Sequence, residues 1–207
     1  MLIQPIVEGQ GDETSVPVLL RRLRDEAQLW ELEIGRPHRR RRTQLVRRDS
    51  LQAAVQVAAL HEDCAGILVL FDADDDCPKD LGPTLEGWAR EVSGQRPCAV
   101  VMANREYEAW FLASIEALRG YAGILPDAAS HSNPEAPRDA KGELERRMSR
   151  TVSYSATVDQ VALTARLDLE SAYRRCRSFR KLVNAFGSLA TAAGVVLPVS
   201  WPPAAWI

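Results

Sequence analysis

The pattern of apolar and polar positions divides the first 119 residues into alternating strand-like and helix-like segments. Residues 66–71 form an unbroken apolar run rich in branched side chains, which is typical of a strand buried on both faces of a parallel sheet. Similar segments occupy residues 2–7, 32–35 and 98–103, and each is followed by apolar residues at helical spacing. Four strand–helix units in succession predict an α/β fold: a Rossmann-like, mostly parallel sheet of about four strands with helices on both faces.

The remainder of the chain has the composition of a loop followed by helices. Residues 120–142 contain three prolines, and residues 143–150, 158–177 and 178–186 have helical patterns, with Gly187 as a helix stop. The apolar, proline-rich tail is expected to fold back onto the core, although a docking peptide is the alternative. We therefore expect an α/β domain over residues 1–119, a loop over 120–142, and a helical extension over 143–207 packed on the domain.

Composition narrows the class of protein. Of the 207 residues, 46% are hydrophobic and 26% are charged, as in globular domains. No apolar run approaches the ~20 residues of a membrane span, and the N-terminus lacks the features of a signal peptide. The four cysteines form no CxxC pair, so neither a zinc site nor a disulfide framework is indicated. A cytoplasmic protein with reduced thiols and no membrane partner is the simplest interpretation.

Acidic residues follow two of the expected strands. Asp72, Asp74 and Asp76 come directly after the strand at 66–71, and Glu8 and Asp12 lie in a glycine-containing turn after the first strand. The carboxyl ends of parallel strands meet at one edge of a sheet, where ligands bind. Carboxylate oxygens are preferred ligands of hard divalent cations, so this pattern predicts a Mg²⁺ or Mn²⁺ site. A solvated acidic turn is the alternative.

Other charged residues are weaker candidates for the same site. Glu106 and Glu108 follow the fourth strand, and Glu108 is the better candidate for a metal ligand; acidic residues are also favourable in any first helical turn. Lys141 and Lys181 are candidates for contacting a phosphate, unless they are ordinary exposed lysines.

The net charge is −2, but basic residues are unevenly distributed. The run Arg39, Arg40, Arg41 and Arg42 is a candidate for binding a nucleic-acid backbone. A charged strand edge that prevents aggregation is the alternative interpretation of this run.

Two motifs resemble the TOPRIM domain, which topoisomerases, primases and a class of nucleases share. The first is Val7-Glu8-Gly9-Gln10-Gly11-Asp12 and the second is Phe71-Asp72-Ala73-Asp74; the spacing of the first is most similar to overcoming-lysogenisation-defect nucleases. The wider pattern, including residues 104–110 and 177–182, resembles a bacterial family known as domain of unknown function 4276. The chain has no room for the separate tyrosine domain of a topoisomerase and no zinc cluster of a primase.

The resemblance implies a metal-dependent nucleic-acid phosphodiesterase, with DNA a better candidate substrate than RNA. Glu8, Asp72 and Asp74 would form the catalytic metal cluster, and Lys141 would contact the scissile phosphate. Asp12 would support a second metal, and Glu8 would alternatively act as a general acid or base. Asp76 and Glu108 would be further ligands.

The resemblance also implies partners. Related nucleases are often fused to an ABC-type ATPase, whereas this chain lacks a GxxxxGK[ST] motif. We therefore expect a separate ABC- or AAA-type ATPase partner, a role in phage defence, and a homodimer as a candidate assembly. Two alternatives stay open: a catalytically inactive TOPRIM module that binds nucleic acid or a partner protein, and a metal-dependent nucleotide-sugar transferase, in which Asp-x-Asp also follows a strand.

Overall fold

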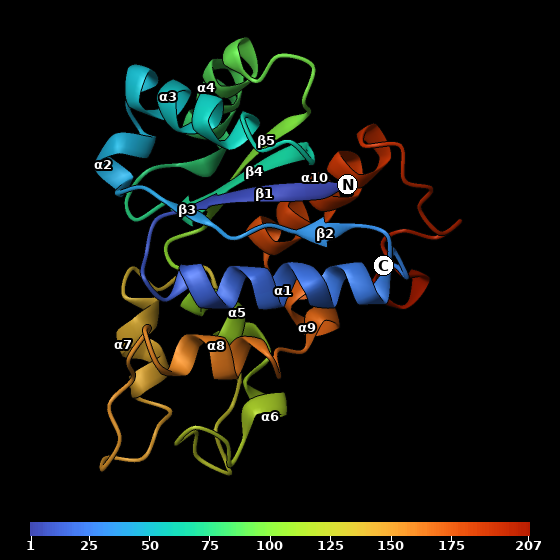
Figure 1. Ribbon diagram of the computed structural model, residues 1–207. Coiled ribbons are helices and arrows are strands. Elements are labelled where there is room, and N and C mark those ends of the chain that lie inside the picture. The colour runs from blue at the N-terminus through green and yellow to red at the C-terminus, as the bar shows by residue number, and fades with distance from the viewer.

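The computed structural model describes all 207 residues and has an α/β architecture built on a parallel sheet (Figure 1). The three long strands are β1 (Leu2–Val7), β4 (Cys64–Asp72) and β5 (Cys98–Ala103), in the sheet order β2-β1-β4-β5. The short strands β2 (Glu33–Ile34) and β3 (His38–Arg39) both pair with β1. The sheet has five strands instead of about four because the segment after the first helix pairs with β1 in two separate pieces.

Strand β4 is buried on both faces, as its apolar sequence predicted. Ile67, Val69 and Phe71 belong to one apolar cluster, which includes residues of α2 (Arg42–Leu45), α3 (Arg48–Ala59) and α4 (Pro78–Val92). Leu68 and Leu70 face the opposite side and join the larger cluster with α1 (Asp12–Glu26) and α10 (Arg177–Ala192). Figure 1 shows α3 and α4 above the sheet and α1 below it.

The remaining helices are short and lie below the sheet in the same view. They are α5 (Glu108–Ala113), α6 (Ile115–Leu118), α7 (Ala140–Glu145), α8 (Asp159–Thr164), α9 (Leu169–Arg175) and the 3₁₀ helix η1 (Ala204–Trp206). The expected single helix over 158–177 is two helices, because the Asp168 side chain accepts hydrogen bonds from the amides of Glu170 and Ser171 and starts α9 anew. The larger apolar cluster extends from Ile3 to Trp206, so these helices share a core with the sheet. None of the helices combines the length and apolar character needed to cross a bilayer.

The predicted helix stop at Gly187 is wrong. Helix α10 continues to Ala192, and Gly187 lies buried within it. A Cβ atom at this position would lie 2.5 Å from Nε1 of Trp201, so the glycine permits the tail to pack closely against the helix. The tail folds back onto the core as expected, with Trp206 only 5% exposed.

The proline-rich loop before α7 is anchored by a buried carboxylate. Glu135 is 8% exposed and accepts hydrogen bonds from the backbone amides of Arg177 and Ser178, at 2.9 and 2.8 Å, and from the Ser178 hydroxyl. This contact satisfies free amides at the start of α10 and ties the loop to the helix next to β5.

Candidate functional site

The acidic residues predicted from the sequence gather at the carboxyl edge of the sheet. Val7 pairs with Leu70 across β1 and β4, so Glu8 emerges beside the end of β4, where Asp72 is the last residue. Glu108 starts α5, shortly after β5. The sheet register, and not a local turn, therefore brings together carboxylates that lie about 60 to 100 residues apart in sequence.

Glu8 has a carboxylate oxygen whose hydrogen-bonding capacity is unused. Its Oε2 atom is buried and has no hydrogen-bond partner. Burial, together with the nearby charges of Asp74 and Asp12, raises the pKa of Glu8 to about 7, against the smaller lowering effects of Arg42 and the Asp72 amide. A buried oxygen without a partner is costly, so this site favours either a proton or a cation.

Asp72 experiences the same crowding of negative charge. Its pKa is raised well above the ordinary range, first by burial and then by the charges of Glu108, Asp12 and Glu8. The Tyr107 backbone amide donates a 2.9 Å hydrogen bond to Oδ1 and fixes the orientation of the carboxylate. Asp72 thus links the end of β4 to the start of α5.

Asp12 is held by two hydrogen bonds within the chain. Its Oδ2 atom accepts from the Gly9 amide and its Oδ1 atom accepts from Nε2 of Gln160, both at 2.8 Å. Gln160 comes from α8 and is 3% exposed. At Gly11, a Cβ atom would lie 2.5 Å from the Ala156 carbonyl oxygen, so this close approach requires glycine. With both oxygens engaged, Asp12 shapes the Glu8 turn.

Glu108 is buried at the start of α5, and its charge is close enough to raise the pKa of Asp72. It is 6% exposed, and burial raises its pKa to about 7 despite the nearby Tyr154 hydroxyl, which lowers it. The Tyr154 hydroxyl is itself buried and has no hydrogen-bond partner of ordinary geometry. Lys141 Nζ lies 5.8 Å from the centre of the Tyr154 ring, and the Lys141 amide donates to Glu106 Oε2 at 2.8 Å. The structure therefore brings Lys141 and both predicted glutamates to one corner of the site.

Arg42 faces the acidic loop after β4. Its Nε atom lies 3.1 Å from Asp74 Oδ2, and its guanidinium also pairs with Asp76. The same side chain donates to the carbonyl oxygens of Asp72 and Ala73, at 3.3 and 3.1 Å. Arg42 thus supplies a positive charge that partly neutralises the acidic loop. Asp76 contacts this arginine and is exposed to solvent.

The other members of the arginine run lie nearer to solvent. Arg39 Nε is 3.4 Å from Glu13 Oε2, Arg40 donates to the Arg39 carbonyl oxygen, and Arg41 is exposed before α2. Because β3 pairs with the last residues of β1, these arginines follow the same edge of the sheet as the carboxylates.

The carboxylates fit a divalent cation in type and charge, because hard cations prefer carboxylate oxygens and the Glu8 Oε2 atom lacks a partner. As the side chains stand, no three acidic, histidine or cysteine side chains form a group spaced to ligate one ion. Binding would therefore require these side chains to turn towards the ion while the strands hold their positions.

The comparison with protein families agrees with the wider sequence pattern. A family model described as "Domain of unknown function (DUF4276)" matches residues 7–186. The chain belongs to this family. The matched range includes every carboxylate described above and most of α10, so the whole site lies within the DUF4276 region. Neither the curated proteins nor the solved structures provide a match to the chain.

Three side chains at the site of this DUF4276 protein were not recognised as partners from the sequence. Gln160 holds Asp12, Tyr154 lies against Glu108, and Arg42 neutralises the loop that carries Asp74. Gln160 stands 148 residues from its partner; its sequence context indicated a helix-capping residue, which does not point to Asp12, and no local motif marks Tyr154. Arg42 was singled out, but its membership of an arginine run pointed to nucleic acid instead of to the acidic loop.

Proposed function

We propose that this DUF4276 protein is a TOPRIM-like, Mg²⁺- or Mn²⁺-dependent phosphodiesterase acting on nucleic acid, with DNA as the first substrate to test. The observation that best supports the proposal is the unpartnered, buried Oε2 atom of Glu8 among neighbouring carboxylates. Carboxylates crowded together disfavour their own ionisation unless a cation neutralises them. Glu8, Asp72 and Asp74 would hold the ion, with Glu108 as a further ligand.

A bound divalent cation supplies the positive charge that stabilises the phosphate and the leaving oxygen. The protein's own groups supply the proton transfer and the positioning. If Glu8 does not ligate the ion, its pKa of about 7 suits it to exchange a proton near neutral pH, and it would instead act as a general acid or base. Lys141, beside Tyr154 at the same corner, would contact a phosphate oxygen.

The arrangement favours a phosphodiesterase over a nucleotide-sugar transferase. An Asp-x-Asp motif alone would suffice to hold a diphosphate in the transferase. Here, the pKa of Asp72 at the end of β4 is raised by Glu8 and Asp12, which follow β1, and by Glu108, which follows β5. Contributions from three adjacent strand ends support an ion held between the strands.

The test is cleavage of supercoiled plasmid and of labelled oligonucleotides by the purified protein in Mg²⁺ or Mn²⁺. We expect Asp72→Asn to lower the rate by about 10²-fold or more. Glu145→Gln, a matched change at an exposed residue of α7, should leave the rate unchanged. Equal cleavage by Asp72→Asn, or cleavage in EDTA, would contradict the proposal. Nucleic-acid binding with no cleavage would favour the inactive TOPRIM module.

The resemblance to ATPase-linked nucleases extends the proposal to a separate ATPase that acts with this protein in phage defence. Affinity purification of the tagged protein from its native host tests this part. Recovery of an ABC- or AAA-type ATPase supports it, and purification without any ATPase counts against it.

A further inference from the structure

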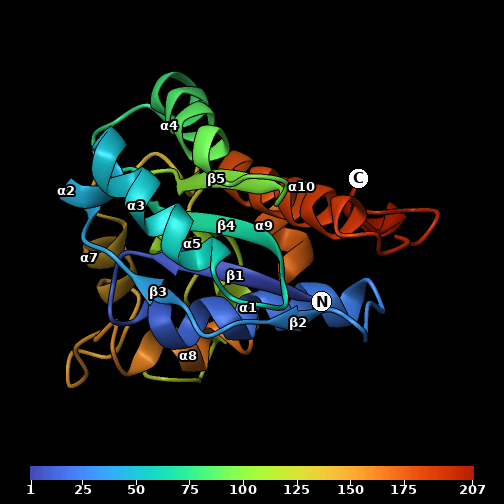
Figure 2. The ribbon, with the colours of Figure 1, turned by 45° about the horizontal axis from the view of Figure 1, so that its top comes forward.

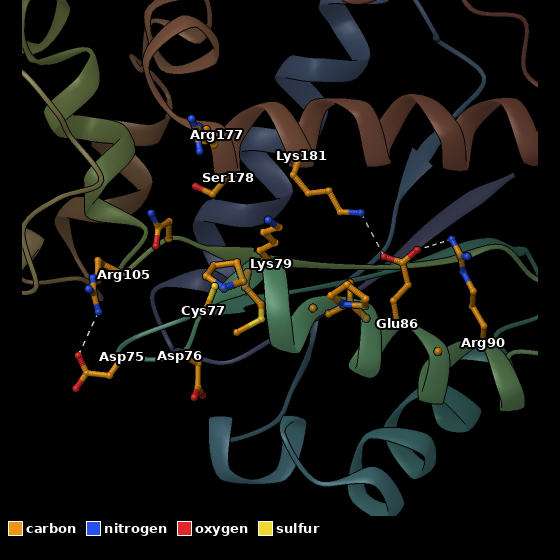
Figure 3. Close-up of a pocket in the computed structure, with 17 residues that line it drawn as sticks. Asp75, Asp76, Cys77, Lys79, Glu86, Arg90, Arg105, Arg177, Ser178 and Lys181 are labelled. Carbon is orange, nitrogen blue, oxygen red and sulfur yellow. Dashed lines mark hydrogen bonds and ion pairs between the residues drawn. The ribbon is translucent and has the colours of Figure 1, made fainter.

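A cavity of about 870 Å³ lies between α4 and α10, beside strand β5 (Figure 3). Strand β5 is the last in the sheet order, and Figure 2 shows α4 and α10 on either side of it. Val100 and Met102 of β5 form an apolar part of the cavity wall, and the rest of the lining is mainly polar or charged. The cavity is therefore bounded by one strand edge and two helices.

The cavity has an excess of positive charge. Its lining includes five cationic side chains, namely Lys79, Arg90, Arg105, Arg177 and Lys181, and three carboxylates. Each carboxylate already has an arginine or lysine partner: Asp75 pairs with Arg105 and Arg138, Asp76 with Arg42, and Glu86 with Arg90 and Lys181.

Two of the cations, Lys79 and Arg177, are exposed and form no ion pair. They come from opposite walls of the cavity, α4 and α10 (Figure 3). Unpaired cations on facing walls attract an anionic ligand into the space between them.

The cavity opens beside the carboxylate cluster. Asp75 and Asp76, which line it, lie three and four residues after Asp72 in sequence. The Asp74 amide, between Asp72 and Asp75, donates to the Arg105 carbonyl oxygen at 2.9 Å. At the other end, a smaller hollow of about 480 Å³ shares Arg90 and extends along β5 past Cys98. A chain-like ligand could thus extend from the carboxylates along the strand edge.

We propose that this cavity binds one or two nucleotides of a single nucleic-acid strand next to the bond that is cleaved. The inference rests on the proposed phosphodiesterase function. Cavities of ~300–1,000 Å³ hold ligands of this size, whereas a stacked duplex would remain outside. Lys79 and Arg177 bind phosphates, and the nearly buried side chains of Val100 and Met102 form the floor of the cavity beneath the sugar or base. The lining contains no aromatic side chain, so backbone charge determines affinity and base preference is weak.

Binding can be measured without cleavage by placing the variants in the Asp72→Asn protein. The probe is a fluorescein-labelled dT₁₂ strand, followed by anisotropy over a range of salt concentrations. Lys79→Ala/Arg177→Ala should raise Kd by about tenfold or more and reduce the slope of log K against log[salt] by about 1.4. Arg21→Ala/Arg150→Ala, which removes two exposed arginines outside the cavity, should change neither. If both double variants have equal Kd and slope, the inference is wrong.

Cys77 offers a second readout, because it lines the cavity and is the only exposed cysteine; the other three are buried. Saturating dT₁₂ should protect Cys77 from a bulky maleimide, with Cys77→Ser as the labelling control. Unchanged labelling at saturation would overturn the inference.

The two proposals fail separately. Cleavage by the wild-type protein, combined with dT₁₂ binding that ignores Lys79 and Arg177, would overturn the cavity assignment alone. Cavity-dependent binding without cleavage would support the assignment and contradict the phosphodiesterase.

Discussion

Glu8 and Glu108 are carboxyls whose protonation in the folded protein differs from that in the unfolded chain. Their pKa values rise from 4.5 to about 7, mainly because of burial. The folded state therefore binds more protons than the unfolded state between these pH values. It follows that, without a cation, the contribution of these groups to the free energy of unfolding is greatest below pH 4.5 and decreases as the pH rises to about 7.

The first prediction concerns Glu8→Gln, which removes the charge and keeps the shape. In EDTA at pH 8, the variant should be more stable than the wild type by on the order of 1–2 kcal/mol after solvent screening, or roughly 2–8 °C in Tm. At pH 5 the two proteins should differ little, because Glu8 is then largely protonated. Mg²⁺ should raise the Tm of the wild type more than that of the variant. A lower Tm for the variant at both pH values would show that Glu8 is not repelled by its neighbours.

A second prediction concerns Gly11, where the turn after β1 passes close to the segment before α8. Gly11→Ala should lower the free energy of unfolding by about 1–3 kcal/mol, because the added Cβ atom collides with the Ala156 carbonyl oxygen. Gly87→Ala in α4 is the matched control, since nothing lies within 4 Å of the new atom. It should be neutral or stabilising by about 0.5–1 kcal/mol. Equal effects in urea denaturation would argue against a tight approach at Gly11.

At the scale of elements, the long strands and their acidic ends were predictable because their signals are local. The apolar run before Asp72 marks β4, and the alternation of its side chains between two clusters confirms burial on both faces. Ends of helices were less predictable. Gly187 is of the residue type that ends helices, but here it makes room for Trp201. That contact depends on the tail turning back onto α10, which the local pattern around Gly187 does not indicate. The separate pairing of β2 and β3 with β1 likewise depends on which residues of the strands align across the sheet, and the local sequence does not specify that alignment.

The docking of the tail on α10 gives a third prediction. Gly187→Ala should destabilise the protein by about 1–3 kcal/mol, because a Cβ atom would lie 2.5 Å from Trp201 Nε1. In a Trp201→Ala background the same change should be neutral or stabilising, because alanine is the better helix former. A double-mutant cycle in thermal unfolding measures this coupling. An equal cost of Gly187→Ala in both backgrounds would show that the tail does not determine the glycine.

At the scale of the whole molecule, the site is a product of topology. The sequence indicated which carboxylates would meet, since strand ends in a parallel sheet share an edge. Helical patterns were present near α7 and α8, but nothing in them signalled the contacts that complete the site: Gln160 reaches Asp12 from α8, and Lys141 reaches Glu106 from α7. Such contacts depend on how the C-terminal helices pack under the sheet, which no local pattern specifies.

If the proposed function is right, carboxylates at the ends of β1 and β4 share one divalent cation. Crystals soaked in Mn²⁺, with data collected at the manganese absorption edge, would show where the ion binds. We expect one strong anomalous peak between the carboxylates of Glu8 and Asp72, bonded to both, and its loss in Glu8→Gln crystals. A peak confined to other residues, or no peak at saturating Mn²⁺, would contradict this expectation.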